Sequence, residues 1–300
     1  MPRSAWQARS AAASLVRFGR SSALTPIAML AACAGTRAEH PPPTAHRNEA
    51  DGASRVAQET RLADAQPAPP MTPSPRKSAR LADGRPGRFI DLEVASHPDP
   101  IVWEPASEEL ELPMIVVAHG AGGDPDWHCD YWSRVVGRSA FLLCLRGEDL
   151  GGKYGGHYFP EHHTLERMLE ASVAAAERRY GQQLRSTQGV YIGYSQGATM
   201  GALILPTHAG RFSRAILIEG GYAQWNVQRA LDFKQAGGIA IFISCGTSTC
   251  SRKAEQTVTW FERAGSRAKM ASAPGQGHTP AGGVGENAVA GLAWVLSQGR

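Results

Sequence analysis

The chain has 300 residues and a mass of 32.0 kDa, which fits one large domain or two of ordinary size. Hydrophobic residues make up 42% and charged residues 19% of it, a globular composition that excludes disorder throughout the chain. Four arginines in residues 1–32, a segment without acidic residues, account for the whole formal charge of +4. Because the rest of the chain is neutral overall, the basic balance does not indicate a nucleic-acid partner.

Residues 1–32 have the layout of a secretory signal peptide. A basic, Ser/Ala-rich region precedes an apolar run over 23–32 that is too short to span a membrane, and Cys33 follows. Leu30-Ala31-Ala32-Cys33 is similar to the bacterial lipobox, in which the cysteine becomes the lipidated N-terminus. We expect an exported protein whose one contact with the membrane is a lipid on Cys33. The alternatives are a signal peptide with an incidental cysteine and an organellar transit peptide.

Residues 33–87 predict a disordered tether. Nine of the 20 prolines fall within 34–87, among Ala, Arg and Ser, and large apolar residues are scarce. Such a segment has too little apolar surface for its burial to offset the conformational entropy lost on ordering. The composition changes at Arg88, and we expect residues 88–300 to form one domain.

The other four cysteines favour two disulfides. Once Cys33 is assigned to the lipid, an even number remains in what would be an oxidising compartment. Closeness in sequence favours the pairs Cys129–Cys144 and Cys245–Cys250. The alternative is four reduced, buried thiols.

From Arg88 onward, short apolar runs alternate with helical patterns. Strands are expected over 89–94, 101–104, 114–118, 140–145, 189–193, 215–218, 239–243 and 269–271. Apolar residues three and four positions apart predict a helix over 165–180, and further helices are expected over 196–205, 251–264 and 285–298. This alternation indicates an α/β fold with a doubly wound, mostly parallel sheet flanked by helices.

Gly193-Tyr194-Ser195-Gln196-Gly197 matches the pattern G-x-S-x-G between an expected strand and an expected helix. The glycines permit a sharp turn, and the turn presents the Ser195 hydroxyl at a helix N-terminus, where negative charge is favoured. The pattern alone occurs by chance. Its strand–turn–helix context favours a nucleophile over a structural turn serine.

Two more segments extend this motif to a resemblance to the α/β-hydrolase family. His119-Gly120-Ala121-Gly122-Gly123 follows an apolar strand and is similar to the family's H-G-x-G oxyanion loop, and Gly277-His278 lies after the last expected strand. The resemblance covers about residues 88–300, and Ser195 lies in a context most similar to esterases, phospholipases and dienelactone hydrolases. It implies the family's order of serine, acid and histidine, and it implies no cofactor.

Chemistry and resemblance together assign the base and the oxyanion donors. His278 takes the family's histidine position and is the expected general base toward Ser195. The backbone N–H of Gln196 and, by resemblance, that of Ala121 are the expected oxyanion donors. His119 is expected either to fix the shape of the oxyanion loop or to be a packing residue without that role. The alternative for His278 is a surface-loop residue without a catalytic role. The other candidates for the general base are His157, His162 and His163.

The acid departs from the family's pattern. The family usually places an aspartate after the seventh strand, but the expected strand over 239–243 is followed by no carboxylate before Glu255. Some members carry the acid after the preceding strand, where this chain has Glu219. Glu219 is therefore the expected acid, and the alternative is a cleft glutamate that binds substrate or caps a helix. The remoter candidates for the acid are Asp232, Glu255, Glu148 and Asp149.

The two expected disulfides bear on this site. A Cys245–Cys250 bridge would lock the loop that carries the aspartate in other members. Cys129 is expected in a loop after the oxyanion segment, and a bridge to Cys144 would pin that loop to the neighbouring strand.

The expected reaction is hydrolysis of a small-molecule carboxylic ester through an acyl-enzyme. The alternatives are a serine peptidase of the same fold and an inactive hydrolase-fold surface protein that binds a ligand. No Cys/His metal spacing occurs in the sequence, and residues 151–156 lack the spacing of a phosphate-binding loop. Aromatic residues expected near the active edge would either line an apolar pocket or pack in the core: Trp127, Tyr131, Trp132, Tyr154, Tyr158, Phe159, Tyr194, Tyr222 and Trp225.

Overall fold

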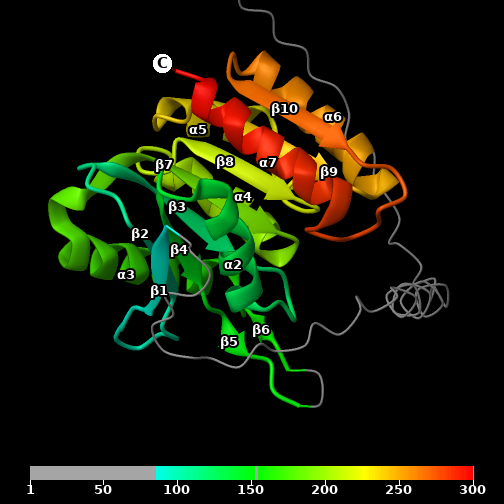
Figure 1. The fold of residues 1–300 in the computed structure, drawn as a ribbon. Coiled ribbons are helices and arrows are strands. Elements are labelled where there is room, and N and C mark those ends of the chain that lie inside the picture. Colours follow the sequence, from blue (N-terminus) through cyan, green and yellow to red (C-terminus); the bar gives the residue numbers. More distant parts are fainter. Residues whose placement is uncertain (1–85, 153–154, 300) are drawn as a thin grey trace, which may run out of the picture. The chain divides into compact units, whose positions relative to one another are not determined.

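A computed structural model describes residues 86–152 and 155–299 (Figure 1). The expectations for the signal peptide, for Cys33 and for the tether up to residue 85 lie outside the described residues. In the described part of the chain, no helix combines the length and the apolar character needed to cross a bilayer.

The centre of the domain is an eight-stranded sheet with the order β1-β2-β4-β3-β7-β8-β9-β10. β2 runs antiparallel to β1 and β4, and all the pairs from β4 to β10 are parallel. The sheet is therefore mostly parallel, as the apolar runs predicted. The strands are β1 (Gly87–Asp91), β2 (Ile101–Pro105), β3 (Leu112–Ala118), β4 (Phe141–Leu145), β7 (Leu184–Tyr194), β8 (Arg214–Ile218), β9 (Ala240–Cys245) and β10 (Arg267–Ser272).

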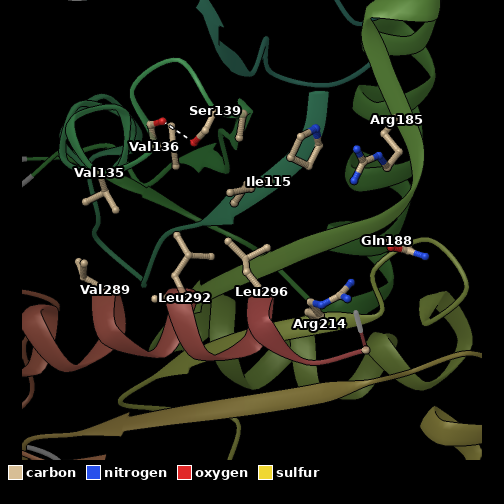
Figure 2. Close-up of a pocket in the computed structure, with 14 residues that line it drawn as sticks. Ile115, Val135, Val136, Ser139, Arg185, Gln188, Arg214, Val289, Leu292 and Leu296 are labelled. Carbon is tan, nitrogen blue, oxygen red and sulfur yellow. Dashed lines mark hydrogen bonds between the residues drawn. The ribbon is translucent and has the colours of Figure 1, made fainter. Parts of the chain in front are cut away.

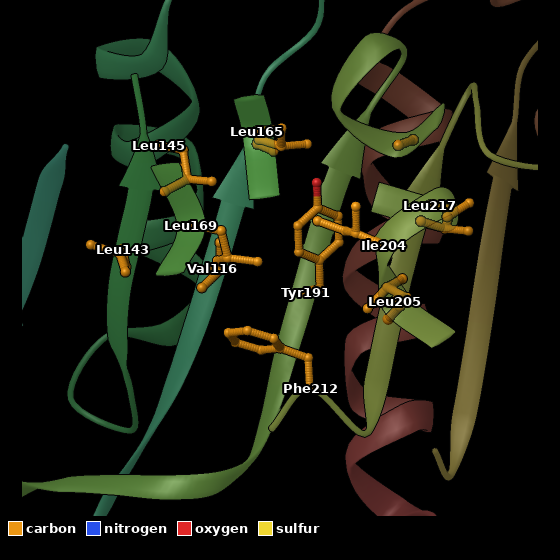
Figure 3. Close-up of a cluster of buried hydrophobic side chains, with 14 of the residues drawn as sticks. Val116, Leu143, Leu145, Leu165, Leu169, Tyr191, Ile204, Leu205, Phe212 and Leu217 are labelled. Carbon is orange, nitrogen blue, oxygen red and sulfur yellow. The ribbon is translucent and has the colours of Figure 1, made fainter. Parts of the chain in front are cut away.

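Helices cover both faces of this sheet. Because side chains alternate along a strand, Val116 of β3 packs in one core cluster and its neighbours Ile115 and Val117 in the other. The first cluster lies beneath α3 to α6, and the second lies beneath α2 and α7. Figure 3 shows the part of the first cluster that packs against α3 and α4. The helices are α2 (Pro125–Val136), α3 (His162–Tyr180), α4 (Gln196–His208), α5 (Val227–Gln235), α6 (Ser248–Arg263) and α7 (Gly282–Ser297), with a 3-10 turn, η2 (Gly181–Gln183).

The segment around Cys129 differs from the expected loop, because it forms α2. The side chain of Asp124 accepts hydrogen bonds from the N–H groups of Asp126 and Trp127, and Pro125 occupies the first helical position. These capping contacts, together with the burial of Cys129 on the sheet, stabilise the helix. The sequence analysis also missed α5 and a small two-stranded sheet of β5 (Glu148–Asp149) and β6 (His157–Tyr158).

Both expected disulfides are present. Cys129–Cys144 joins α2 to β4 across 15 positions of sequence, and Cys245–Cys250 joins the end of β9 to the first turn of α6 across 5 positions. Two buried disulfides are typical of an oxidising, exported environment.

A cavity of about 550 Å³ lies between α2 and α7, at the amino ends of the central strands (Figure 2). We call this side of the sheet the amino edge. The helix side of the cavity is apolar and is lined by Val135, Val136, Val289, Leu292 and Leu296. On the strand side, Pro113 and Ile115 of β3 are apolar, and the polar lining residues are Arg185, Gln188 and Arg214.

Candidate active site

Three neighbouring strands end side by side at the opposite edge of the sheet, which we call the carboxyl edge. The register pairs Tyr194 of β7 with Ile218 of β8, and Ile218 with Ser244 of β9. Ser195 follows the first strand and Glu219 follows the second. Parallel pairing therefore places the expected nucleophile and the expected acid next to each other.

His278 connects these two residues. Its Nε2 lies 2.7 Å from Oγ of Ser195, and its Nδ1 lies 3.1 Å from Oε2 of Glu219. A carboxylate accepts, so the network assigns the proton to Nδ1 and leaves Nε2 free to accept from the Ser195 hydroxyl. The structure thus brings together the three residues that the sequence analysis singled out. The histidine side chain is 52% exposed, whereas that of Glu219 is 1% exposed.

The backbone at Ser195 has an uncommon conformation, with φ 49° and ψ −107°. Two glycines make this turn possible. A Cβ on Gly197 would contact the carbonyl oxygens of Ala118 and His119, and one on Gly193 would lie 2.6 Å from Cα of Ala198. Hydrogen bonds from Ser195 N to Ile218 O (2.8 Å) and from Gly197 N to His119 O (3.1 Å) fix the turn against its neighbours. The spacing G-x-S-x-G therefore has a direct steric cause here.

Glu219 also has a positive φ, of 49°, and its carboxylate accepts four hydrogen bonds. Burial raises the pKa of this carboxyl, but the hydrogen bonds from His278, Thr247 and Gly246 outweigh burial, and the pKa is lowered overall. The side chain is therefore an ionised group inside the protein. Such a group suits the stabilisation of a positively charged imidazole.

His119 holds the glycine-rich loop after β3. Its Nδ1 donates to the carbonyl of Gly120 (2.7 Å), its Nε2 accepts from the N–H of Gly147 (3.0 Å), and its ring stacks on Phe159 with centroids 4.5 Å apart. Desolvation lowers the pKa of His119 to about 4, so the ring is neutral at pH 7. His119 thus fixes the loop shape, one of the two roles that the sequence analysis left open.

The two expected oxyanion donors lie on either side of this turn. Among the described residues, the backbone N–H of Gln196 and that of Ala121 donate to no protein acceptor. The Gln196 side chain forms a clamp, since its Oε1 accepts from Phe159 N (2.9 Å) and its Nε2 donates to Phe159 O (3.0 Å). This clamp ties the start of α4 to the segment after β6. No sequence pattern indicates this clamp, because the two segments are 37 positions apart.

The remoter acid candidates do not contact His278 in the described part of the chain. Glu148 and Asp149 lie exposed in β5, Asp232 lies in α5 and Glu255 lies in α6. Of the competing histidines, His157 bonds to Gly147 O (3.1 Å), whereas His162 and His163 begin α3. None of these histidines hydrogen-bonds to Ser195 among the described residues.

The expected aromatic residues divide into two groups. Trp132, Phe159 and Trp225 are buried and pack in the core. Tyr194 is partly exposed, and its hydroxyl donates to the carbonyl of His278 (3.0 Å). The other partly exposed members are Trp127, Tyr131, Tyr158 and Tyr222, and Tyr154 lies outside the described residues.

One group of side chains in the described residues has metal-ligand atoms within 4.8 Å of one another, namely Glu219, Cys245 and Cys250. The two sulfurs are bonded to each other, and the carboxylate already accepts four hydrogen bonds. The group is therefore a disulfide packed beside the acid. The hydrogen bonds from Gly246 and Thr247 to this acid were also missed by the sequence analysis.

The sequence matches no protein-family model and no curated protein. Solved structures with a similar fold include the fluorophosphonate-binding serine hydrolase FphF of Staphylococcus aureus (12% identity, 71% of this chain and 99% of that one, TM-score 0.53). Others are a putative dienelactone hydrolase of Klebsiella pneumoniae (15%, 70% and 97%, TM-score 0.52) and Est1E of Butyrivibrio proteoclasticus (11%, 70% and 98%, TM-score 0.50). At such low sequence identity, the similarity shows a shared fold only. The described part of this chain has the α/β-hydrolase fold.

Proposed function

We propose that this protein is a serine hydrolase that cleaves carboxylic esters of small molecules through an acyl-enzyme at Ser195. One observation carries the proposal: an unbroken chain of hydrogen bonds leads from the Ser195 hydroxyl through His278 to the buried carboxylate of Glu219. A serine hydroxyl is a weak nucleophile at neutral pH, and such a chain is the arrangement that activates it.

In this mechanism, Oγ of Ser195 attacks the ester carbonyl carbon while Nε2 of His278 takes its proton. Glu219 stabilises the imidazolium that forms, and the N–H groups of Gln196 and Ala121 donate to the oxyanion. The imidazolium then protonates the departing alkoxide, and the ester C–O bond breaks to leave the acyl-enzyme. Water attacks this intermediate with His278 again as the base, which releases the carboxylic acid and restores Ser195. The steps need no cofactor.

The test is turnover of short p-nitrophenyl esters by the mature protein, beside its Ser195→Ala variant. We expect Ser195→Ala to lower kcat by a factor of about 10⁴ to 10⁶ and to abolish labelling by a fluorophosphonate. A folded wild type that neither turns over esters nor reacts with the fluorophosphonate would instead be an inactive ligand-binding protein. Faster cleavage of matched amides than of esters would identify a serine peptidase.

We also propose that the chain is exported and anchored through a lipid on Cys33. The support is the apolar run that ends at Cys33, together with two buried disulfides, which suit an oxidising compartment. We expect the wild type to partition into detergent and Cys33→Ala to remain in the aqueous phase. Equal partitioning of the two proteins would exclude the anchor.

A further inference from the structure

The carboxylate of Glu219 receives most of its hydrogen bonds from a loop that contains no catalytic residue. Its Oε1 accepts from Gly246 N and from Thr247 N (2.9 Å), and its Oε2 accepts from Thr247 Oγ1 (3.0 Å) and from His278 Nδ1 (3.1 Å). Three of these four donors belong to residues 246–247, directly after β9. The position that carries an acid in other proteins with this fold thus carries the donors for an acid here.

The loop between Cys245 and Cys250, which we call the donor loop, is held in place by a disulfide and by hydrogen bonds at its start. The Cys245–Cys250 disulfide spans it, and both cysteines are buried. Ala273 N donates to the carbonyl of Cys245 (2.7 Å), and Glu219 N donates to Ser244 O (2.9 Å). The end of β9, from which the loop starts, is therefore joined to Glu219 and to the segment that leads to His278.

The Thr247 hydroxyl makes two hydrogen bonds, one that caps α6 and one to Glu219. Its Oγ1 accepts from Cys250 N (3.2 Å), which caps the N-terminus of α6, and its hydroxyl proton is then available to Glu219. The N-terminus of a helix of 16 residues also favours a nearby negative charge. The hydroxyl and the helix start thus both stabilise the ionised carboxylate.

We infer that Thr247 is a positioning residue for the catalytic acid, and that the Cys245–Cys250 disulfide holds the donor loop against Glu219. The inference rests on the proposed function. A glutamate has one more rotatable bond than the aspartate usual at this site, so its carboxylate needs partners on both oxygens to keep Oε2 on His278. The loop supplies these partners.

Besides the donors at residues 246–247, three titratable groups in the described part of the chain face the carboxylate. His278 reaches it from the loop before α7, Tyr194 from the end of β7 and Tyr222 from the segment after β8. Burial and the charge of Glu219 raise the pKa of both tyrosines, that of Tyr194 to about 12, so both are neutral near pH 7. A change in the titration of Glu219 can therefore be assigned to its donors and to His278.

The first experiment compares Thr247→Val with Thr247→Ser. We expect Thr247→Val to lower kcat about tenfold at unchanged KM, because one donor to the charged form of Glu219 is lost. Thr247→Ser keeps the hydroxyl and should behave like the wild type. The kinetics of both variants are measured well below the unfolding temperature of Thr247→Val, because the valine variant also loses the cap of α6.

The second measurement does not depend on turnover. In protein with ¹³C-labelled glutamate carboxyls, the titration midpoint of Glu219 should rise in Thr247→Val and stay in place in Thr247→Ser. An unchanged midpoint in Thr247→Val would overturn the inference. If the midpoint rises but the wild type neither turns over esters nor labels with a fluorophosphonate, the proposed function fails and the positioning of Glu219 stands.

The second disulfide provides a matched control for the first. We expect the pair Cys245→Ala/Cys250→Ala to lower kcat several-fold and to raise the Glu219 midpoint. The pair Cys129→Ala/Cys144→Ala also removes one buried disulfide, but it joins α2 to β4, so it should lower stability with little change in kcat. Equal effects of the two pairs on kcat and on the midpoint would show that the Cys245–Cys250 bond contributes only general stability.

Discussion

At both the carboxyl edge and the amino edge of the sheet, a buried charged side chain lies at the helix terminus of opposite partial charge, but the two pairings have different roles. At the carboxyl edge, the N-terminus of α6 lies beside the buried carboxylate of Glu219. At the amino edge, the buried guanidinium of Arg214 donates to Val295 O (2.9 Å) and Gln298 O (2.7 Å) at the C-terminus of α7. Helix N-termini favour anions and C-termini favour cations. The first pairing leaves one carboxylate oxygen on His278, whereas the second joins β8 to the C-terminal end of α7. Changes at the carboxyl edge should therefore alter catalysis, and changes at the amino edge should alter stability.

The largest expected effect is that of Glu219→Gln. The variant keeps the shape of the side chain but loses the charge that stabilises the imidazolium, so kcat should fall by a factor of about 10³ to 10⁴. Steady-state kinetics on p-nitrophenyl acetate, with urea unfolding in parallel, measure this effect. A loss below tenfold would remove Glu219 from the role of acid and direct attention to Glu255 or Glu148.

Acid should destabilise the carboxyl edge before carboxylates titrate. Desolvation lowers the pKa of His119 to about 4 and that of His128, a buried residue of α2, to about 3, whereas a histidine of the unfolded chain has its ordinary pKa of 6.5. Between these values the unfolded state binds more protons, so the free energy of unfolding should fall as pH falls from 6.5 toward 4, on the order of 3 kcal/mol for each histidine. Urea unfolding at pH 7, 5.5 and 4.5 measures this loss.

The pH window identifies the groups responsible. The lowered pKa of Glu219 makes its own contribution disappear only as pH falls below the ordinary carboxyl value of 4.5. His128→Gln should therefore flatten the stability profile between pH 6.5 and 4.5. A wild-type profile that is already flat in this range would mean that the buried histidines do not control acid stability.

Arg214→Met tests the other side of the comparison. The variant keeps the apolar stem but leaves the carbonyls of Val295 and Gln298 without this donor, so the free energy of unfolding should fall by about 2 kcal/mol. The value of kcat should change less than twofold when measured below the unfolding transition. A loss of kcat comparable to that of Glu219→Gln would end the distinction between the two edges.

The smallest expected effect is that of Gln196→Ala. The variant keeps the backbone N–H but removes the clamp on Phe159, so we expect kcat to fall about tenfold through a less ordered oxyanion loop, equivalent to about 1.4 kcal/mol. KM for p-nitrophenyl acetate should change little. An unchanged kcat would limit the clamp to holding the segment after β6.

The sequence predicted the parts of this architecture that depend on local patterns. Apolar runs located the eight strands of the main sheet, and chain order after two of them led to Ser195 and Glu219. The helix α2 was missed because Trp127 and Cys129 looked like loop residues. Asp124 followed by Pro125 was the available signal, since an N-cap and a first-turn proline mark a helix start.

The contacts that hold the acid could not be predicted in the same way. Gly246 and Thr247 meet Glu219 because β8 and β9 are paired in a particular register, and that register is a property of the folded sheet. The clamp between Gln196 and Phe159 likewise depends on the packing of two distant segments. Sequence order indicated the candidate acid, whereas its hydrogen-bond donors depend on the lateral arrangement of the strands.

The positive φ angles at Ser195 and Glu219 have a consequence for protein engineering. Each non-glycine residue in this region of conformational space costs on the order of 1 kcal/mol or more, and glycine would relieve that cost. A redesign that selects only for backbone conformation would therefore favour glycine at both positions. Screens for robust variants of this protein need both positions held constant, because the proposed reaction requires these two strained residues.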